Sequence, residues 1–293
     1  MTTLADLSDG MAQAVTAASA AVVRVEGRKW MGASGVVWAQ GVIVTANHVV
    51  ERDEKIQVGL PDGGRAAAVL AGRDPATDLA VLRVEASGLA ALPRSDSSAL
   101  SVGRLVLAVG RPGERLQASL GVLSAVEGPW RTPAGGQVEA YLQPDLVMYP
   151  GFSGGPLLDL AGGWIGLNTS GLVRNTAITL PAATLQRVVE TLLAHGHMRR
   201  AFLGIGSQMV RLPEGLVAGQ ETGLLISSVE PGSPAEKGGL FLGDTLLAVN
   251  DQPTRQMDDL LAFLNGDVAG QVVPVKVLRG GAVQTLSVTL GER

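Results

Sequence analysis

The chain has 293 residues and a formal net charge of −4, with 46% hydrophobic and only 3% aromatic residues. Its length favours one large or two moderate domains, and its charge argues against a nucleic-acid partner, which requires a concentrated positive field. The sequence has no cysteine, which excludes disulfides, thiolate metal sites and cysteine nucleophiles, and no apolar run reaches the roughly 20 residues of a membrane span.

The first residues predict a short amphipathic helix over 4–18. Because the start lacks the basic region of a signal peptide, the chain as given is expected to be cytoplasmic, or extracytoplasmic if a leader has been removed. Short strands follow, with turns at 39–41 and 61–64. The later strand patterns are LAVLRV, GRLVLAVG, LQASLGVLSAV, VEAYLQ, GGWIGLNTS and AITLP. Their spacing is typical of a β-sandwich or barrel.

The spacing of apolar residues becomes helical in PAATLQRVVETLLAHG, residues 181–196, where Gly196 is suited to end the helix. A short polar run comes next. We therefore predict a mainly β domain at 1–197 and a small α+β domain at 198–293, the latter with helical patterns near AEKGGL and in MDDLLAFLNG.

Ser153 lies among glycines and prolines in YPGFSGGPLLD. Such a serine fits an ordinary turn, and it also fits a nucleophile whose neighbours expose backbone N–H groups. His48 is the candidate base, because the other two histidines lie at the helix end and in the linker. Asp78, directly before an apolar strand, is a strand cap or the acid that orients His48. The order His48, Asp78, Ser153 is that of chymotrypsin-type proteases.

The segment GFSGG also fits the G-x-S-x-G elbow of α/β-hydrolases, which would make the chain an esterase. That elbow requires a helix directly after the serine and a triad in the order serine, acid, histidine. Gly155 and Pro156 disfavour the helix, and the acids between Ser153 and the later histidines are poorly placed. His195 and His197 lack a third metal ligand in the sequence, so we expect no metal and no cofactor.

The segments TANHVV, DPATDLAVL, PGFSGGPLLD and GWIGLNTS resemble the HtrA family of trypsin-fold serine proteases, and the last 92 residues resemble its PDZ domain. The resemblance implies a chymotrypsin-like double β-barrel followed by a small α+β PDZ domain. It implies that Ser153 is the nucleophile, His48 the general base and Asp78 the residue that orients it. The N–H groups of Gly151 and Ser153 would form the oxyanion hole.

The chain departs from the family at Phe152, where the family usually has asparagine. The resemblance places the pocket for the residue before the scissile bond, the S1 pocket, along two stretches. Its expected lining residues are Leu146, Val147, Met148, Leu167, Asn168, Thr169 and Ser170. Because these are mostly apolar or neutral, small or medium aliphatic substrate residues are the expected fit.

PDZ domains bind an extended peptide as an added strand and capture its C-terminal carboxylate on backbone N–H groups. Phe202, Leu203, Gly204 and Ile205 resemble that capture loop. In the following helix Leu260, Leu261 and Leu264 form a groove wall or belong to the core, and the sequence does not separate the two.

The expected function is that of an ATP-independent serine endopeptidase that cleaves unfolded or damaged proteins in protein quality control and stress response. The alternative is a peptide-binding scaffold or chaperone with a resting protease domain, for which Phe152 is the best support. The expected partners are unfolded protein or peptide substrates and peptide C-termini. The family forms homotrimers through aromatic residues near the N-terminus, and residues 1–29 contain none, so a trimer is an expectation from resemblance alone.

Overall fold

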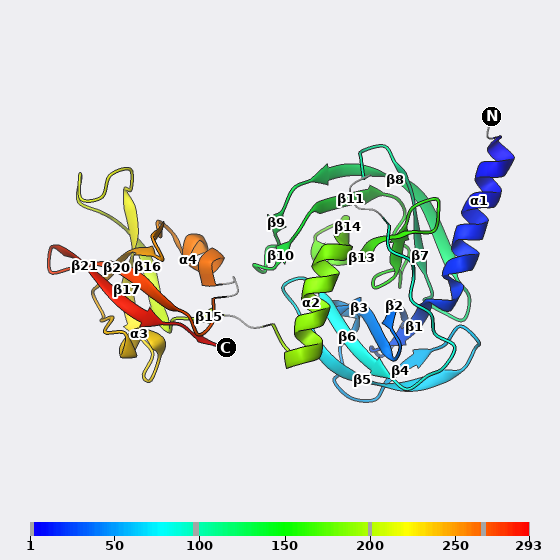
Figure 1. The fold of residues 1–293 in the computed structure, drawn as a ribbon, viewed down its shortest axis with the longest axis horizontal. Coiled ribbons are helices and arrows are strands. Elements are labelled where there is room, and N and C mark those ends of the chain that lie inside the picture. The colour runs from blue at the N-terminus through cyan, green and yellow to red at the C-terminus, as the bar shows by residue number, and fades with distance from the viewer. Residues whose placement is uncertain (1–2, 96–99, 199–200, 265–267, 293) are drawn as a thin grey trace. The chain divides into compact units, whose positions relative to one another are not determined.

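The computed structural model describes residues 3–95, 100–198, 201–264 and 268–292 (Figure 1). The chain divides into two compact units, residues 1–198 and 199–293, one residue beyond the boundary predicted from the sequence. Part of the predicted linker, residues 199–200, and the end of MDDLLAFLNG lie outside the described residues.

The first unit is built almost entirely from strands. Its helical segments are α1 (Leu4–Ala17), η1 (Ala18–Ala20), η2 (Asn47–Val49) and α2 (Ala182–His195). Its strands are β1 (Val22–Glu26), β2 (Ala33–Ala39), β3 (Val42–Ala46), β4 (Ile56–Gly59), β5 (Arg65–Asp74), β6 (Leu79–Val84), β7 (Leu105–Gly110), β8 (Gln117–Glu127), β9 (Trp130–Arg131), β10 (Gln137–Val138), β11 (Tyr141–Asp145), β12 (Pro156–Leu158), β13 (Trp164–Val173) and β14 (Thr176–Pro181).

The strands close into two antiparallel barrels of six strands each. The first barrel has the order β1-β2-β3-β6-β5-β4 and the second β11-β14-β13-β12-β7-β8. Aliphatic side chains make up most of both interiors, as expected from a sequence with few aromatic residues, and Phe152 is the aromatic member of the cluster in the second barrel. The two closed barrels confirm the predicted chymotrypsin-like architecture.

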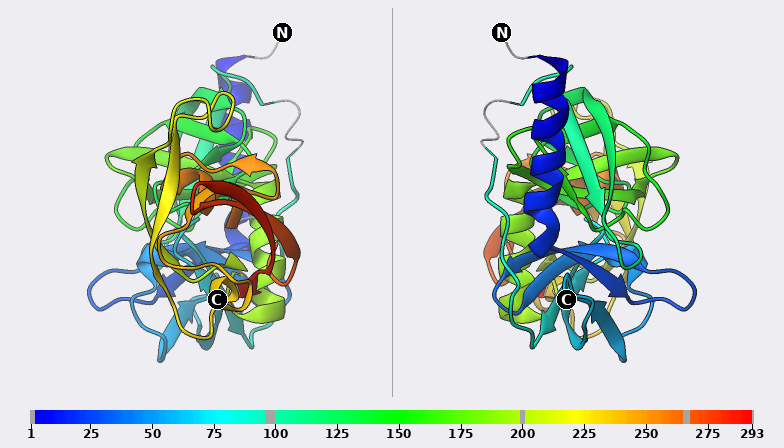
Figure 2. Two further views of the ribbon diagram at one scale, coloured as in Figure 1. Left: turned by 90° about the vertical axis from the view of Figure 1, so that its left-hand side faces the viewer. Right: turned by 90° about the vertical axis from the view of Figure 1, so that its right-hand side faces the viewer.

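Helix α2 joins the two barrels. It packs on β5 and β6 of the first barrel and on β13 and β14 of the second (Figure 1). Gly196 ends the helix in the left-handed conformation, at φ 78°, and its N–H donates to the carbonyl of Leu192. Helix α1 contacts β7. It lies along the outside of the unit, as the right view of Figure 2 shows.

The structure departs from the predicted strands at two places in the first unit. The segment VEAYLQ is divided between β10, which pairs with β9, and β11 of the second barrel, and a short strand, β12, begins at Pro156, shortly after Ser153. The α/β-hydrolase elbow needs a helix at that position, so the structure excludes that alternative.

The second unit is a small sheet with two helices. Its strands are β15 (Ala201–Phe202), β16 (Ile205–Arg211), β17 (Thr222–Val229), β18 (Thr245–Val249), β19 (Gln252–Pro253), β20 (Val272–Arg279), β21 (Ala282–Thr289) and β22 (Gly291–Glu292). Its helices are α3 (Pro234–Lys237) and α4 (Met257–Leu264). The main path of the sheet is β16-β17-β18-β20-β21, which makes β16 an edge strand.

Candidate active site

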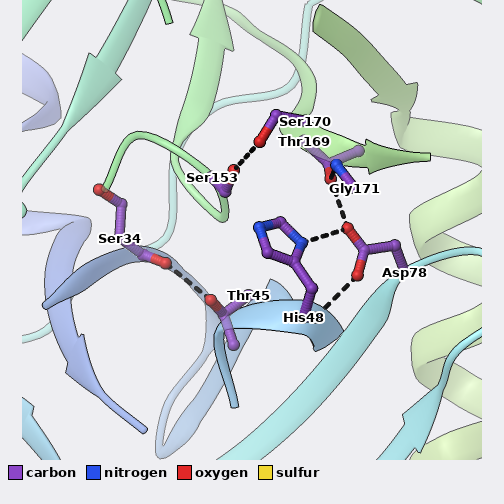
Figure 3. Close-up of polar contacts among 8 residues, drawn as sticks. All are labelled: Ser34, Thr45, His48, Asp78, Ser153, Thr169, Ser170 and Gly171. Carbon is purple, nitrogen blue, oxygen red and sulfur yellow. Dashed lines mark hydrogen bonds and ion pairs between the residues drawn. The ribbon is translucent and has the colours of Figure 1, made fainter. Parts of the chain in front are cut away.

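His48 and Asp78 meet at one place on the first barrel, where β3 ends and the neighbouring strand β6 begins. Strand β3 ends at Ala46 and runs into the turn η2, which carries His48, while Asp78 immediately precedes β6. The Nδ1 atom of His48 lies 2.7 Å from Oδ2 of Asp78, and the His48 N–H donates to Oδ1 at 2.8 Å (Figure 3). Because an ionised carboxylate only accepts, Nδ1 of the neutral imidazole carries the proton and Nε2 remains available as a base.

Asp78 is held in an uncommon backbone conformation. Its φ is 57°, in the left-handed region that residues other than glycine rarely adopt, and only 4% of the residue is exposed. Its carbonyl accepts a hydrogen bond from the N–H of Asn47, so the backbone segments that carry His48 and Asp78 are bonded to each other. Such strain persists where the surroundings over-determine the geometry, and it is frequent at functional sites.

A strand of the second barrel covers this pair. The hydroxyl of Thr169 donates to Oδ2 of Asp78, and the N–H of Gly171 donates to Thr169 Oγ1 at 3.0 Å. A Cβ atom on Gly171 would lie 2.6 Å from Nδ1 of His48, so this position has no room for a side chain. The hydroxyl of Thr169, which is one of the predicted S1 residues, is therefore bonded to Asp78.

Ser153 lies across from the His48 ring (Figure 3). The residue is 6% exposed, and its Oγ is 3.1 Å from Oγ of Ser170 on β13. Within the described residues Ser153 makes no hydrogen bond to His48. The hydroxyl must turn from Ser170 toward Nε2 of His48 before that base can remove its proton.

The loop around Ser153 leaves two backbone donors unused. Gly151 and Gly154 have φ values of 87° and 88°, which glycine adopts without steric cost. The N–H of Phe152 donates to Tyr149 and that of Gly154 to Asn168. Within the described part of the chain, the N–H groups of Gly151 and Ser153 donate to no acceptor, so both are available to an oxyanion.

Ser34 of the first barrel supports this loop and was not identified from the sequence. Its side chain is fully buried, and its hydroxyl donates to the carbonyl of Gly151 at 2.7 Å while accepting from the N–H of Arg111 at 2.8 Å. Its own N–H donates to the carbonyl of Ser153. One residue therefore fixes the backbone on both sides of Phe152, and no sequence signal marks a serine for that task.

Arg111 anchors the same region from the end of β7. Its guanidinium donates to three backbone carbonyls, those of Val22, Glu114 and Ser19, at 2.7, 2.9 and 3.0 Å. Burial lowers the pKa of Arg111 below its ordinary value. Arg111 thus connects the end of β7, where its own N–H binds Ser34, to Val22 at the start of the first barrel.

Phe152 fills the core beneath the loop. It is fully buried in a cluster of the second barrel whose other buried members are Val106, Ala108, Leu123, Leu142, Leu157 and Ile165. Its ring packs edge-on against Tyr149, with centroids 5.4 Å apart. A Cβ atom on Gly110 would lie 2.8 Å from the ring, so a glycine opposite Phe152 makes room for the larger side chain.

The other predicted S1 residues differ in exposure. Leu167 and Asn168 are fully buried, and Asn168 accepts a hydrogen bond from the hydroxyl of Thr179. Val147 and Ser170 are exposed, while Leu146 and Met148 are partly buried against the cluster that holds Phe152. Only this second set is accessible enough to contact a substrate side chain.

In the second unit, the predicted capture loop lies between β15 and β16. Gly204 has a φ of 82°, and a Cβ atom there would lie 2.3 Å from Ser233. The carbonyls of Leu203 and Gly204 accept from Ala235 and Glu230, whereas the N–H groups of the same two residues donate to nothing in the described ranges. Two unused N–H groups at the start of an edge strand are suited to bind a carboxylate.

Helix α4 contacts β16 and borders the same edge of the sheet. Leu260 and Leu264 are 3% and 8% exposed and belong to the core, whereas Leu261 is 46% exposed. The structure thus separates the residues that the sequence left undecided, since of these three leucines only Leu261 is available to a peptide.

Comparisons with known proteins agree with the fold of both units. The family model of the trypsin-like peptidase domain matches residues 33–167, and that of the PDZ domain matches residues 225–279. A solved structure of an HtrA-type protease, AlgW, with a decapeptide has a TM-score of 0.76 and 28% sequence identity, covering 97% of this chain and 98% of the other.

The curated relatives carry a name that includes a location. A "probable periplasmic serine endoprotease DegP-like" from Marinomonas sp. is 36% identical over 274 residues, and one from Ectopseudomonas mendocina is 34% identical over 269. The chain spans 58% and 56% of their lengths. Their periplasmic names contradict the cytoplasmic location expected from the chain as given, and that expectation is wrong. None of the helices in the described ranges combines the length and hydropathy of a transmembrane span.

The crystal structure of the serine endoprotease from Yersinia pestis superimposes with a TM-score of 0.75 at 30% identity, covering 97% of this chain and 98% of that one. The likeness extends over nearly the whole of both chains and so includes both units of this one. The chain belongs to the HtrA family of trypsin-fold serine proteases with a C-terminal PDZ domain.

Proposed function

We propose that the chain is an ATP-independent serine endopeptidase. The observation that carries the proposal is the 2.7 Å contact between His48 and Asp78 opposite Ser153, beside a loop with two unused N–H groups. These are the base, the orienting acid, the nucleophile and the oxyanion donors that acyl transfer requires.

In the proposed reaction, Ser153 turns from Ser170 to His48, and Nε2 of His48 takes its proton as Oγ attacks the scissile carbonyl. Asp78 stabilises the resulting imidazolium through Nδ1. The N–H groups of Gly151 and Ser153 receive the developing oxyanion, and one such donor contributes about 3 kcal/mol to the transition state. His48 then returns the proton to the leaving amine, and a water molecule repeats the sequence to release the acyl group.

We propose substrates that are unfolded or damaged proteins, met outside the cytoplasm. An extended, unfolded segment can lie across the loop of Ser153, which a compact fold cannot. Val147 and Met148 are accessible residues that follow β11 of the second barrel and precede Ser153. Because both are apolar, they favour a small or medium aliphatic residue before the cut.

The PDZ unit is proposed to bind peptide C-termini. The carboxylate would bind the N–H groups of Leu203 and Gly204, the peptide would add a strand to the edge of the sheet at Ile205, and Leu261 would contact a peptide side chain. Phe202 lies partly buried next to this loop.

The test is a time course of casein digestion by the wild type beside Ser153→Ala, with the new ends sequenced by mass spectrometry. Digestion by the wild type alone, with aliphatic residues at the new C-termini, supports the proposal. Digestion by both proteins would show a contaminating protease or another nucleophile. An inactive wild type, even with added C-terminal peptides, would refute the proposal.

A second function, a scaffold or chaperone with a resting protease, is favoured by the contact of Ser153 with Ser170 in place of His48. It predicts that wild type and Ser153→Ala suppress the aggregation of an unfolded protein equally and leave it intact.

A further inference from the structure

A cationic pocket lies on the first barrel, outside the residues assigned to catalysis. It has a volume of 180 Å³ and is lined by residues of β1 and β4, the loop before β2 and the turn before β4. Its charged lining residues are Arg24, Arg28, Lys29, Arg52, Lys55 and Glu26. Five cations and one carboxylate therefore share a small space.

The single carboxylate is already neutralised. Glu26 pairs with Arg24 at 3.2 Å and with Arg65 at 3.6 Å. The remaining four lining cations have no carboxylate within 4.0 Å among the described residues. Asp53, which is near in sequence, pairs with Arg73 instead. The pocket therefore keeps an unbalanced positive charge, which an anion would stabilise.

The pocket wall is ordered by its own hydrogen bonds. The Nε of Arg28 donates to the carbonyl of Met31 at 2.9 Å, and a guanidinium nitrogen of Arg52 donates to the carbonyl of Arg28 at 2.7 Å. These bonds hold the loop of residues 28–31 in a defined shape, so the cations are positioned before any ligand arrives.

The pocket borders the loop of the proposed nucleophile. Gly32 is one of its lining residues, and a Cβ atom on Gly151 would lie 2.7 Å from the carbonyl oxygen of Gly32. Two residues further, Ser34 binds the carbonyl of Ser153. The pocket and the candidate oxyanion donor at Gly151 are thus separated by a single residue in contact with both.

The proposed S1 residues all belong to the second barrel, whereas the pocket belongs to the first. We propose that a substrate whose acyl side lies on the second barrel crosses Gly151 and continues toward Gly32, where the pocket is a subsite for an acidic side chain on the leaving-group side of the scissile bond. The protease then favours substrates with aspartate or glutamate shortly after the cut. This inference rests on the proposed endopeptidase function.

The test uses paired fluorogenic peptides with amidated C-termini, so that the PDZ unit is not offered a carboxylate. The pairs are identical except for aspartate or asparagine at each of the first four positions after the cut. At low salt, the best aspartate peptide is expected to exceed its asparagine twin about fivefold in kcat/KM, as one or two partly exposed charge pairs would give. The ratio should fall as salt is raised.

The variant is Lys29→Gln/Lys55→Gln, because both lysines are exposed and neither makes a hydrogen bond in the described residues. It should reduce the ratio to below about twofold by removing two of the cations. The control, Arg83→Gln/Lys237→Gln, removes two exposed charges elsewhere and should leave the ratio unchanged. Equal kcat/KM for both twins at all four positions would overturn the proposal.

Casein digestion runs alongside and separates the two possible failures. If casein is cut but the twins are equal, the subsite is wrong and the endopeptidase stands. If nothing is cut, the endopeptidase is wrong, and the pocket is judged by fluorescence anisotropy of the labelled peptides. In that case, tighter binding of the aspartate peptide that is lost in Lys29→Gln/Lys55→Gln supports an anion site, and equal binding of the twins overturns it.

Discussion

Replacing Phe152 with asparagine, the residue that the family usually has, should destabilise this protein instead of improving it. The side chain is fully buried among aliphatic residues of the second barrel. An asparagine there would leave a void beside Gly110, and its amide would have no polar partner in the apolar cluster.

The cost follows from those two effects. Truncating a buried phenylalanine costs about 3–5 kcal/mol, and an unsatisfied buried polar group adds about 1–3 kcal/mol. Asparagine keeps part of the volume, so we expect a loss of about 4 kcal/mol in the free energy of unfolding. Phe152→Leu removes less volume and no hydrogen-bonding need arises, so its loss should be about 1–2 kcal/mol.

Tryptophan fluorescence during urea unfolding measures this effect in the correct unit, because Trp30, Trp38, Trp130 and Trp164 all belong to the first unit. With a slope of about 2 kcal/mol per molar urea, Phe152→Asn should lower the midpoint by about 2 M. A midpoint equal to that of the wild type would refute the packing argument.

Gly110→Ala provides an independent check of the same contact. Its Cβ would collide with the Phe152 ring, so it should destabilise the wild type. In the Phe152→Leu background the same substitution should cost less, since a smaller side chain faces it. Additive effects of the two substitutions would contradict the contact.

Three further predictions concern the supports of the site and its stability. Ser34→Ala leaves the carbonyl of Gly151 without its buried donor, and we expect kcat on a peptide substrate to fall about tenfold with little change in KM; an unchanged kcat would exclude this supporting role. Thr169→Val removes the hydroxyl that binds Asp78, and its kcat should also fall about tenfold, with circular dichroism showing an intact fold. Burial alone raises the pKa of Glu139, but hydrogen bonds from its arginine and threonine partners outweigh it and hold the pKa below the ordinary value. Its stabilising effect is therefore fully present near pH 7 and is lost as the pH falls through the lowered pKa. Glu139→Gln should lower the urea midpoint at pH 7, and the difference from the wild type should shrink as the pH is lowered through the acid range.

The sequence predicted those features that depend on local pattern and on order along the chain. Alternating apolar residues predicted most strands of both barrels, and the order of His48, Asp78 and Ser153 indicated which residues to bring together. The structure places all three at one site, and the two barrels confirm the fold class.

Features that depend on contacts between distant segments could not be predicted. Ser34 lies 117 positions from the carbonyl that its hydroxyl binds, and nothing around it distinguishes this serine from one in an ordinary strand.

Asn168 and Thr169 were both assigned to one pocket, although successive side chains of a strand point to opposite faces. By that rule the two side chains face opposite ways, and the structure buries both.

The site is divided between the barrels, with His48 and Asp78 on the first and Ser153 on the second, and α2 packs on both after all three have been synthesised. During translation the histidine and aspartate therefore emerge from the ribosome before the serine that they face. Under the proposed function, the three residues come together only once the second barrel has been synthesised and has folded against the first. A chain that ends before Ser153 would then hold the base and the acid but no nucleophile.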